Sequence, residues 1–186
     1  MIDIINKLFS NKNNQDQKYL TFKKIKEIYE IDKLFKSISN YSDTSEIRYV
    51  GGCVRKVINK ETVDDIDLAT NLNPDQVIKC LKNNEIKFYE TGLDHGTITA
   101  VINKKSFEIT SLRKDISTDG RHAKIQYSDN WHQDSLRRDF TINAIYSDID
   151  GNLFDPCNGK KDLENGKVVF IGDAEKRIKE DYLRIL

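Results

Sequence analysis

The feature that most constrains this chain is a pair of aspartates in an alternating apolar stretch, Asp65-Ile66-Asp67-Leu68. In a β-strand, residues two positions apart point to the same side, so both carboxylates project together while Ile66 and Leu68 enter the core. Two carboxylates that lie close together repel each other, and a hard divalent ion such as Mg²⁺ is their usual partner. Solvated acidic pairs are also common, so the pair alone leaves both interpretations open.

A glycine pair upstream, Gly51-Gly52, follows a predicted strand, Ile47–Val50, and precedes a predicted helix. Two glycines let a phosphate group approach backbone N–H groups, and Arg55 adds a donor suited to phosphate oxygens. A glycine turn followed by an acidic pair on the next strand predicts a cradle for a triphosphate and a metal. The alternative is an ordinary tight turn with Arg55 on the surface.

A third carboxylate, Glu108, lies within the apolar stretch Phe107–Thr110. An acid in such a strand either faces solvent or serves as a ligand. A two-metal site, with ions about 3.5–4 Å apart, clamps the attacking hydroxyl and the leaving oxygens and needs several acids. Spacing alone does not decide between these two roles of Glu108.

Hydrophobic periodicity and turn residues predict the remaining elements. The predicted helices cover Tyr19–Ile38, Asn73-Pro74 to about Lys82, Ser135–Ala144 and a last segment from about Asp173. The predicted strands are Ile86–Glu90, Thr97–Asn103, Ser106–Leu112 and Val168–Ile171, with a hairpin at Asp150-Gly151 and a mobile loop over Lys114–Asn130. The fold class is therefore α/β (α+β), with a small mixed or antiparallel sheet flanked by helices.

Composition narrows the classes of function. Thirty Lys+Arg balance thirty Asp+Glu, so a nucleic acid would have to be bound by local clusters of charge. The cysteines Cys53, Cys80 and Cys157 match no zinc spacing and fit a reducing cytoplasm. No apolar run approaches the roughly 18 residues of a membrane span, which predicts a cytoplasmic protein that does not engage a membrane.

Ordered motifs run from about Arg48 to the last residue. They are Tyr49-Val-Gly-Gly-Cys-Val-Arg55, Asp64-Asp65-Ile-Asp67-Leu-Ala-Thr70, Thr91-Gly-Leu-Asp-His95-Gly-Thr97, Phe107-Glu-Ile-Thr-Ser-Leu-Arg113, Asp119-Gly-Arg-His122, Arg137-Arg-Asp-Phe-Thr-Ile-Asn-Ala144, Phe154-Asp-Pro-Cys-Asn-Gly159 with Asp162-Leu163, and Glu180-Asp-Tyr-Leu-Arg184. Together they resemble the class II tRNA CCA-adding enzymes and their bacterial poly(A) polymerase relatives, within the polymerase-β-like nucleotidyltransferases.

The resemblance implies a domain organisation. Residues 46–172 would form the nucleotidyltransferase head, preceded by a polar segment and amphipathic helix over 1–45 and followed by the start of a helical neck over 173–186. The last predicted helix still carries apolar Leu183, Ile185 and Leu186 where the sequence stops. Because a helix with an uncovered apolar face lacks its packing partner, we expect the sequence to be truncated at the neck.

The resemblance also implies roles for individual residues. Asp65 and Asp67 would hold Mg²⁺, and Glu108 would help activate the RNA 3′-hydroxyl. Nucleotide-binding roles fall to Gly51, Gly52, Arg55 and Arg138, with Asp139 and Asn143 as orienting neighbours. Arg137-Arg138-Asp139 would lie on a helix that faces the nucleotide, and the alternative for Arg137 is a surface arginine. The family pattern usually has Asp where this chain has Lys56, and Asp119-Gly-Arg121 would belong to a flexible loop that adjusts during nucleotide switching.

The final motif supports a physical argument about base choice. Asp181 and Arg184 are three residues apart on the predicted helix and so face the same way. The carboxylate accepts hydrogen bonds and the guanidinium donates them. Cytosine and adenine present an amino donor beside a ring-nitrogen acceptor, whereas guanine and uracil present the opposite polarity. The pair could therefore accept C and A without a template; the alternative is a plain helical ion pair.

The predicted activity is transfer of CMP and AMP from CTP and ATP to the 3′ end of tRNA, with release of pyrophosphate. Poly(A) addition is the alternative within the same class, because the motifs of the head do not separate the two. A further alternative is an inactive or split nucleotide-binding fragment that needs a missing C-terminal part. Because the family resemblance implies that tRNA is bound mainly by later domains, we expect the isolated chain to have only weak activity.

Overall fold

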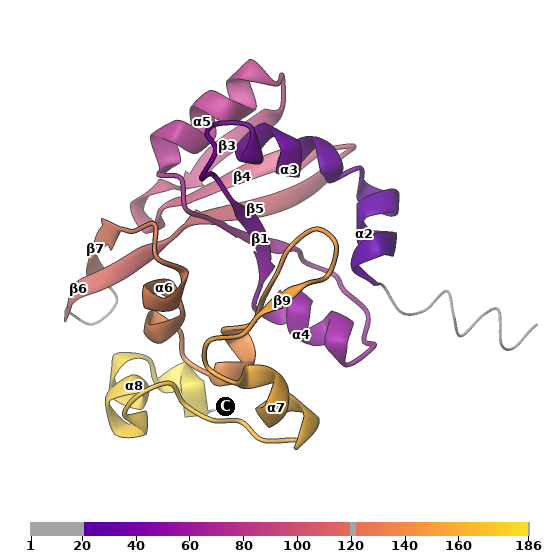
Figure 1. Ribbon diagram of the computed structural model, residues 1–186. Helices are drawn as coiled ribbons and strands as arrows, with labels where there is room; N and C mark the ends of the chain where they lie inside the picture. The colour runs from indigo at the N-terminus through magenta and orange to yellow at the C-terminus, as the bar shows by residue number, and fades with distance from the viewer. Residues whose placement is uncertain (1–20, 120–121, 186) are drawn as a thin grey trace, which may run out of the picture.

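A computed structural model of the chain describes residues 21–119 and 122–185, and within them the strands form one mixed sheet and one hairpin (Figure 1). The sheet has the order β3-β4-β5-β2-β1-β8-β9, and β6-β7 stands apart. The strands are β1 Ile47–Val50, β2 Asp67–Thr70, β3 Lys87–Gly92, β4 Thr97–Ile102, β5 Lys105–Ser111, β6 Arg113–Asp119, β7 His122–Tyr127, β8 Tyr146–Ser147 and β9 Leu153–Phe154. The predicted α/β (α+β) class is confirmed.

The helices are short. The α-helices are α2 Phe22–Tyr29, α3 Asp32–Ser39, α4 Gly52–Ile58, α5 Pro74–Asn83, α6 Trp131–Arg137, α7 Gly159–Glu164 and α8 Ala174–Glu180, and the 3₁₀ turns are η1 Leu93–His95, η2 Thr141–Asn143 and η3 Tyr182–Ile185. In Figure 1, α3 and α5 lie beside β3 and β4, whereas α6, α7 and α8 lie below them. None of the helices in the described residues has the length and apolar character that crossing a membrane requires.

One pairing in the large sheet is parallel. β2 runs parallel to β5, while β3–β4, β4–β5, β1–β2, β1–β8 and β8–β9 are antiparallel. Parallel neighbours need a long crossover, which here consists of α5 and the β3–β4 meander. The strands predicted over Ile86–Glu90, Thr97–Asn103 and Ser106–Leu112 are confirmed as β3, β4 and β5. The parallel pairing sets the N-terminal end of β2 beside the middle of β5.

The sheet divides the core into two unequal parts. The larger cluster includes Leu68, Ile98 and Phe107 together with the buried side chains of α2, α3 and α5. The smaller cluster, on the other face, consists of Val50, Ala69, Leu112 and Tyr146, with Trp131 and Phe154 packed against it. Because side chains alternate along a strand, Asp67 shares its face with Ala69 and the smaller cluster.

The start of α5 follows the sequence prediction closely. The Asn73 side chain accepts a hydrogen bond from the backbone N–H of Gln76, and the Gln76 side chain accepts one from the backbone N–H of Asn73, each at 2.9 Å. Pro74 occupies the first turn. This reciprocal capping box satisfies N–H groups that the helix itself cannot pair.

The prediction of a single helix over Tyr19–Ile38 is wrong for the residues that the structure describes. Two helices, α2 and α3, are separated at Glu30, whose φ of 51° lies in the left-handed region. The break reorients the chain so that Ile31, with 0% of its surface exposed, is buried at the junction. The spacing of apolar residues did not reveal the break, because α2 and α3 direct their apolar residues to the same core.

One predicted segment differs from the structure at the hairpin. The segment predicted as a loop, Lys114–Asn130, instead forms most of the β6–β7 hairpin, whose backbone pairing runs from Arg113↔Tyr127 to Asp119↔His122. Its polar composition hid a structure that depends on backbone hydrogen bonds. Gly120 and Arg121, in the predicted flexible loop, lie outside the described residues.

The predicted helix over Ser135–Ala144 is also different. The α-helix begins earlier, at Trp131 after the N-cap Asn130, and ends at Arg137. Arg138 is extended, with φ −69° and ψ 161°, and η2 follows, so Arg138 and Asp139 do not lie on one helix with Asn143. The strand predicted over Val168–Ile171 is reduced to an isolated bridge between Phe140 and Phe170.

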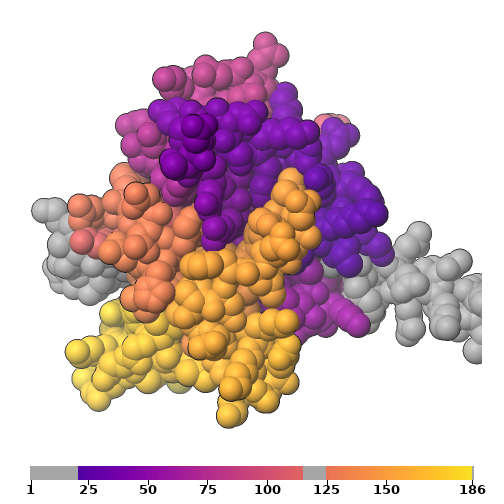
Figure 2. Space-filling view, in the orientation of Figure 1, coloured from indigo at the N-terminus to yellow at the C-terminus, as the bar shows by residue number. Residues whose placement is uncertain are grey.

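At the C-terminal end, α8 follows the N-cap Asp173, as the sequence predicts. In the space-filling view this part of the chain, coloured yellow, lies at the bottom of the visible face (Figure 2). The α-helix ends at Glu180, and its C-cap Asp181 is extended, with φ −152° and ψ 108°. Asp181 and Arg184 are therefore not on one α-helix, which corrects the geometric premise of the base-choice argument.

Candidate functional site

The predicted acids lie at the junction of β2 and β5. Asp67, the first residue of β2, is the direct neighbour of Glu108 in the parallel register. Adjacent residues in paired strands project from the same face, so both carboxylates lie on the side of the smaller core cluster. Asp65 lies two residues earlier, in the loop before β2, and is exposed like Glu108, whereas Asp67 is half-buried.

The electrostatic environment of Asp67 is unfavourable to its charge. Burial raises the pKa of the Asp67 carboxyl, the negative charges of Glu108 and Asp65 raise it further, and Arg138 lowers it. Within the described residues, no group of three or more Asp, Glu, His or Cys side chains is gathered closely enough to hold a metal ion. Asp67 and Glu108 are therefore neighbours in the sheet, and Asp65 lies close enough for its charge to act on Asp67.

The loop before β2 is held by two lysines. The Lys56 ammonium lies 3.1 Å from a carboxylate oxygen of Asp64, and Lys105 donates to the backbone carbonyl of Asp64. Lys56, at the position where the resemblance led us to expect an aspartate, thereby pairs with the residue directly before Asp65. The two contacts fix the loop that carries Asp65.

The glycine pair forms the turn between β1 and α4. Gly51 has a φ of 71° and donates from its backbone N–H to the carbonyl of Ile145 at 3.2 Å. A Cβ on Gly51 would lie 3.6 Å from the Asn143 carbonyl oxygen and 3.8 Å from Nη1 of Arg138. A Cβ on Gly52 would meet nothing within 4 Å. The turn is therefore packed on the Gly51 side and open at Gly52.

Arg55, Asn143 and Asp139 form a chain of polar contacts beside this turn. Arg55 donates from Nη1 to Oδ1 of Asn143, and Nδ2 of Asn143 donates to Oδ1 of Asp139 at 3.0 Å. The same Asp139 oxygen accepts the backbone N–H of Phe140 at 2.7 Å. Arg55 is half-buried rather than on the surface, and it meets two predicted residues, Asn143 and Asp139, from a distant segment of the chain.

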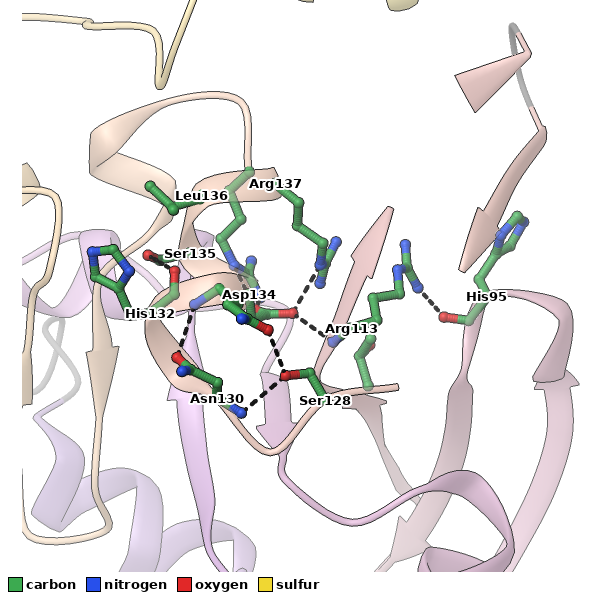
Figure 3. Close-up of polar contacts among 12 residues, drawn as sticks. His95, Arg113, Ser128, Asn130, His132, Asp134, Ser135, Leu136 and Arg137 are labelled. Atoms are coloured by element: carbon green, nitrogen blue, oxygen red, sulfur yellow. Dashed lines mark hydrogen bonds and ion pairs between the residues drawn. The ribbon is translucent and has the colours of Figure 1, made fainter. Parts of the chain in front are cut away.

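Arg138 is anchored by Asp134, which the sequence did not single out. Asp134 has a fully buried side chain and accepts from Nη2 of Arg138 at 3.2 Å and from Nε of Arg137 at 2.8 Å. Figure 3 shows the Asp134 side chain, which comes from α6, with Arg137 and the backbone of Arg113 at the start of β6 directed at it. The i,i+3 and i,i+4 spacings of Asp134 to the two arginines were the available signal in the sequence.

The charge of Asp134 is stabilised despite its burial. Burial alone would raise the pKa of its carboxyl, but the charges of Arg138 and Arg137 and the hydrogen bond from Tyr146 outweigh this and hold the pKa below its usual range. The Tyr146 hydroxyl donates to Oδ2 of Asp134 at 2.7 Å. Asp134 is therefore an ionised acid with its charge compensated from several directions, in contrast to Asp67.

The residues predicted to select the base are occupied with other contacts. Arg184 donates from Nη1 to Oε2 of Glu180 at 2.9 Å and to the backbone carbonyl of Arg177 at 2.7 Å. Oδ1 of Asp181 accepts the backbone N–H of Leu183 at 3.0 Å. In this arrangement Asp181 and Arg184 do not form the side-by-side donor and acceptor that the sequence argument assumed.

Comparison with known proteins gives consistent results. The family model described as "Poly A polymerase head domain" matches residues 47–169. The human "CCA tRNA nucleotidyltransferase 1, mitochondrial" is 46% identical over 145 residues, which are 77% of this chain and 33% of that protein. The CCA-adding enzyme of Oceanobacillus iheyensis is 38% identical over 74% of this chain and 34% of its own length.

A solved structure of the Bacillus stearothermophilus CCA-adding enzyme, in complex with CTP, has a similar fold. The TM-score is 0.70 and the identity 29%, over 83% of this chain and 37% of that one. The present chain thus spans about a third of the length of the curated relatives it matches. The resemblance stated from the motifs is confirmed by these independent comparisons.

Proposed function

The chain belongs to the family of poly A polymerase head domains, and from this we propose that it is a template-independent RNA nucleotidyltransferase. It would add CMP and AMP from CTP and ATP to the 3′ end of tRNA and release pyrophosphate. The observation that carries the proposal is the register of Asp67 beside Glu108, with the turn after β1 open at Gly52. The names of its curated relatives, which are CCA-adding enzymes, support the choice of reaction.

The acids fit a divalent cation, which we propose to be Mg²⁺ held by Asp65 and Asp67. The fit rests on the chemistry of the donors: Asp67 has a raised pKa because burial and two neighbouring acids oppose its charge, and a hard cation would compensate that charge. When bound, Mg²⁺ would supply electrostatic stabilisation of phosphate oxygens. Glu108, at the neighbouring position, would accept the proton of the RNA 3′-hydroxyl.

The remaining residues would position the nucleotide rather than form covalent intermediates. The open backbone at Gly52 would admit the triphosphate, with Arg55 and Arg138 as cationic donors. Asn143 and Asp139 would orient Arg55 through the contacts described above. Orientation and preorganised charge account for most of the catalysis in phosphoryl and nucleotidyl transfer, so rigid side chains are what the reaction requires.

Base selection by Asp181 and Arg184 remains part of the proposal, with residues 173–186 as the start of a helical neck. To pair with a base, Arg184 would have to leave Glu180 and Asp181 would have to release the N–H of Leu183. These exchanges are local and involve exposed or half-exposed groups. The donor and acceptor would then match cytosine and adenine.

Poly(A) addition is the second candidate, because the matching family model is itself described as a poly A polymerase head. Both reactions use ATP and would share the acids and the glycine turn. Location in the cytoplasm likewise remains a prediction: the three free cysteines fit a reducing compartment, whereas the human relative is named as mitochondrial.

Equilibrium binding of each of the four ribonucleoside triphosphates, with and without Mg²⁺, tests the proposal. Binding of CTP and ATP but not GTP or UTP is expected, and Asp181→Ala should remove that preference. Asp65→Ala/Asp67→Ala should abolish the dependence on Mg²⁺, while Asp94→Ala, an exposed acid on η1, should change nothing. Binding of ATP alone would favour poly(A) addition, and binding of none would contradict a nucleotidyltransferase.

A further inference from the structure

We propose that Asp134 is a positioning residue for the nucleotide, acting through Arg138. The inference rests on the proposed function and assigns a role to a residue outside the site predicted from the sequence. The Asp134 side chain has 0% of its surface exposed and contacts two arginines: Arg137, the last residue of α6, and Arg138, the C-cap of that helix. A buried carboxylate in this position determines where an adjacent guanidinium can point.

The contacts of Arg138 are divided between two sides. Nε and Nη2 donate to Oδ2 of Asp134 at 3.3 and 3.2 Å, and Nε also donates to the Tyr146 hydroxyl at 3.1 Å. Nη1 is directed the other way, 3.5 Å from the Asn143 carbonyl and beside the Gly51 turn. Asp134 therefore holds one edge of the guanidinium, and the other edge lies beside the Gly51-Gly52 turn, where we propose that the triphosphate binds.

Asp134 is itself fixed by separate parts of the fold. Tyr146 on β8 donates to Oδ2 at 2.7 Å, and the backbone N–H of Arg113, the first residue of β6, donates to Oδ1 at 3.3 Å. A side chain held by a strand, a hairpin and its own helix loses little further freedom when a ligand binds. Arg138 is thus preorganised, which lowers the cost of ordering an arginine on binding.

Arg137 provides an internal comparison. It uses Nε to contact Oδ1 of the same carboxylate at 2.8 Å and has a similar exposure, 15% against 16% for Arg138. Removing the Arg137 side chain therefore also breaks an ion pair of Asp134, but it leaves the two Arg138 contacts to Oδ2 in place. If Asp134 only stabilises the fold, Asp134→Asn and Arg137→Gln should change CTP affinity to a similar extent. If Asp134 positions Arg138, only Asp134→Asn should weaken CTP binding.

The experiment compares Asp134→Asn, Arg137→Gln, Arg138→Gln and the double variant Asp134→Asn/Arg138→Gln in Mg²⁺-dependent CTP binding and thermal unfolding. We expect Asp134→Asn to weaken CTP binding about tenfold, by analogy with the lower end of the losses seen when residues that orient metal ligands are replaced. Arg137→Gln should lower the melting temperature yet keep the dissociation constant within about twofold of the original. The double variant should bind no more weakly than Arg138→Gln alone, since both changes remove one interaction.

Equal weakening by Asp134→Asn and Arg137→Gln would overturn the inference, as would unchanged CTP binding by Asp134→Asn. In both cases CTP binding by the unaltered chain would leave the proposed function standing, whereas its absence would refute that function. Should Asp134→Asn fail to fold, Tyr146→Phe removes one hydrogen bond to the same carboxylate and one from Nε of Arg138, and should weaken CTP binding two- to threefold. Exchange of the Arg138 Nε proton, followed by NMR, should accelerate in both variants, and unchanged exchange would contradict positioning without reference to nucleotide.

Discussion

At the scale of single residues, the site combines two aspartates in opposite electrostatic conditions. Asp134 is fully buried with its charge compensated, and Asp67 is half-buried beside two other acids. The first arrangement stabilises the fold, and the second destabilises it until a cation or ligand is bound. Ionised groups that oppose folding are frequent where a protein binds a cation, because the repulsion between them is relieved on binding.

The effect of Asp67 on stability can be measured directly. A carboxyl with a raised pKa binds protons more tightly in the folded state, so the free energy of unfolding falls as pH rises from the ordinary aspartate value through the raised value. Asp67→Asn should therefore stabilise the metal-free protein at pH 7 by about 0.5 kcal/mol, the scale of a like-charge neighbour in a sheet. Thermal unfolding with EDTA and with Mg²⁺ tests this: Mg²⁺ should raise the melting temperature of the original chain and not that of the variant. A less stable Asp67→Asn protein in EDTA would contradict the assigned repulsion.

Asp134 should show the opposite dependence on pH. Its pKa is lowered in the folded state, so its stabilising contribution is complete above the ordinary aspartate pKa of about 3.9 and is lost as pH falls through the lower folded value. The difference in unfolding free energy between the original chain and Asp134→Asn should be largest above about pH 4 and shrink in stronger acid. Urea unfolding across this range provides the measurement, and a difference that grew in acid would show that the charge is not what stabilises the protein.

A substitution at Gly52 should affect nucleotide binding without affecting folding. A Cβ there meets nothing in the protein, so Gly52→Ala should fold with unchanged stability, yet the methyl group would occupy the space predicted for the triphosphate. We expect CTP affinity to fall about tenfold, or 1.4 kcal/mol. Asn59→Ala, at the exposed C-terminal end of the same helix, is the matched control. Equal affinities of the two variants would exclude close approach of the triphosphate at Gly52.

The sequence predicted some of these residues better than others. Asp67 and Glu108 could be found because alternation along a strand shows an acid among apolar residues. Asp134 could not be found in this way, because a buried ionised acid is recognisable only once its partners, including the hydroxyl of Tyr146 on a later strand, are placed. The failure at Asp181 has a local cause, since the backbone leaves the helix there.

At the scale of elements, α7 holds the turn that carries Asn143. Gly159, the first residue of α7, packs so closely on η2 that a Cβ would overlap the carbonyl of Thr141. The Asp155 carboxylate accepts the N–H groups of Gly159 and Lys160 at 2.8 and 2.9 Å, and the Thr141 hydroxyl donates to Asp162 at 2.7 Å. The motif from Phe154 to Asp162 is thus structural, and its effect on the site passes through η2.

Gly159→Ala should therefore disturb both stability and binding. Forcing a methyl group into this contact should cost about 1–3 kcal/mol, as in other overpacked sites. Because η2 carries Asn143, CTP affinity should fall as well. Denaturant unfolding and CTP binding would measure the two effects, with Lys160→Ala on the exposed side of α7 as control. Equal free energies of unfolding for Gly159→Ala and Lys160→Ala would show that η2 can move away from the added methyl group without loss of stability.

Element boundaries were predictable where a local signal marks them. Asn73 and Pro74 marked the start of α5, and Asp173 that of α8, because capping is chemistry within one turn. The break at Glu30 and the β6–β7 hairpin lacked such a signal. The first depends on how α2 and α3 reach a common core, and the second on backbone pairing between polar segments.

At the scale of the whole molecule, charge is balanced, with 30 basic and 30 acidic residues. Affinity for RNA arises largely from phosphate neutralisation, so a neutral chain gains little of it. We expect this 186-residue chain to bind CTP but to bind tRNA with a dissociation constant of only about 10⁻⁴–10⁻⁶ M at physiological salt. Fluorescence anisotropy at 50 and 200 mM salt would test this, and tight binding with a steep dependence on salt would contradict it.

The parallel pairing of β2 with β5 has a consequence for when the protein can first work. The two acids are contributed by strands between which α5, β3 and β4 must already be in place, and β1 completes its pairing only when β8 has been synthesised. Contacts between distant segments form late, because the loop between them must be closed first. A nascent chain emerging from the ribosome therefore holds Asp67 and Glu108 apart until β5 has been made and paired with β2, so the proposed site cannot assemble while the earlier strands are being synthesised.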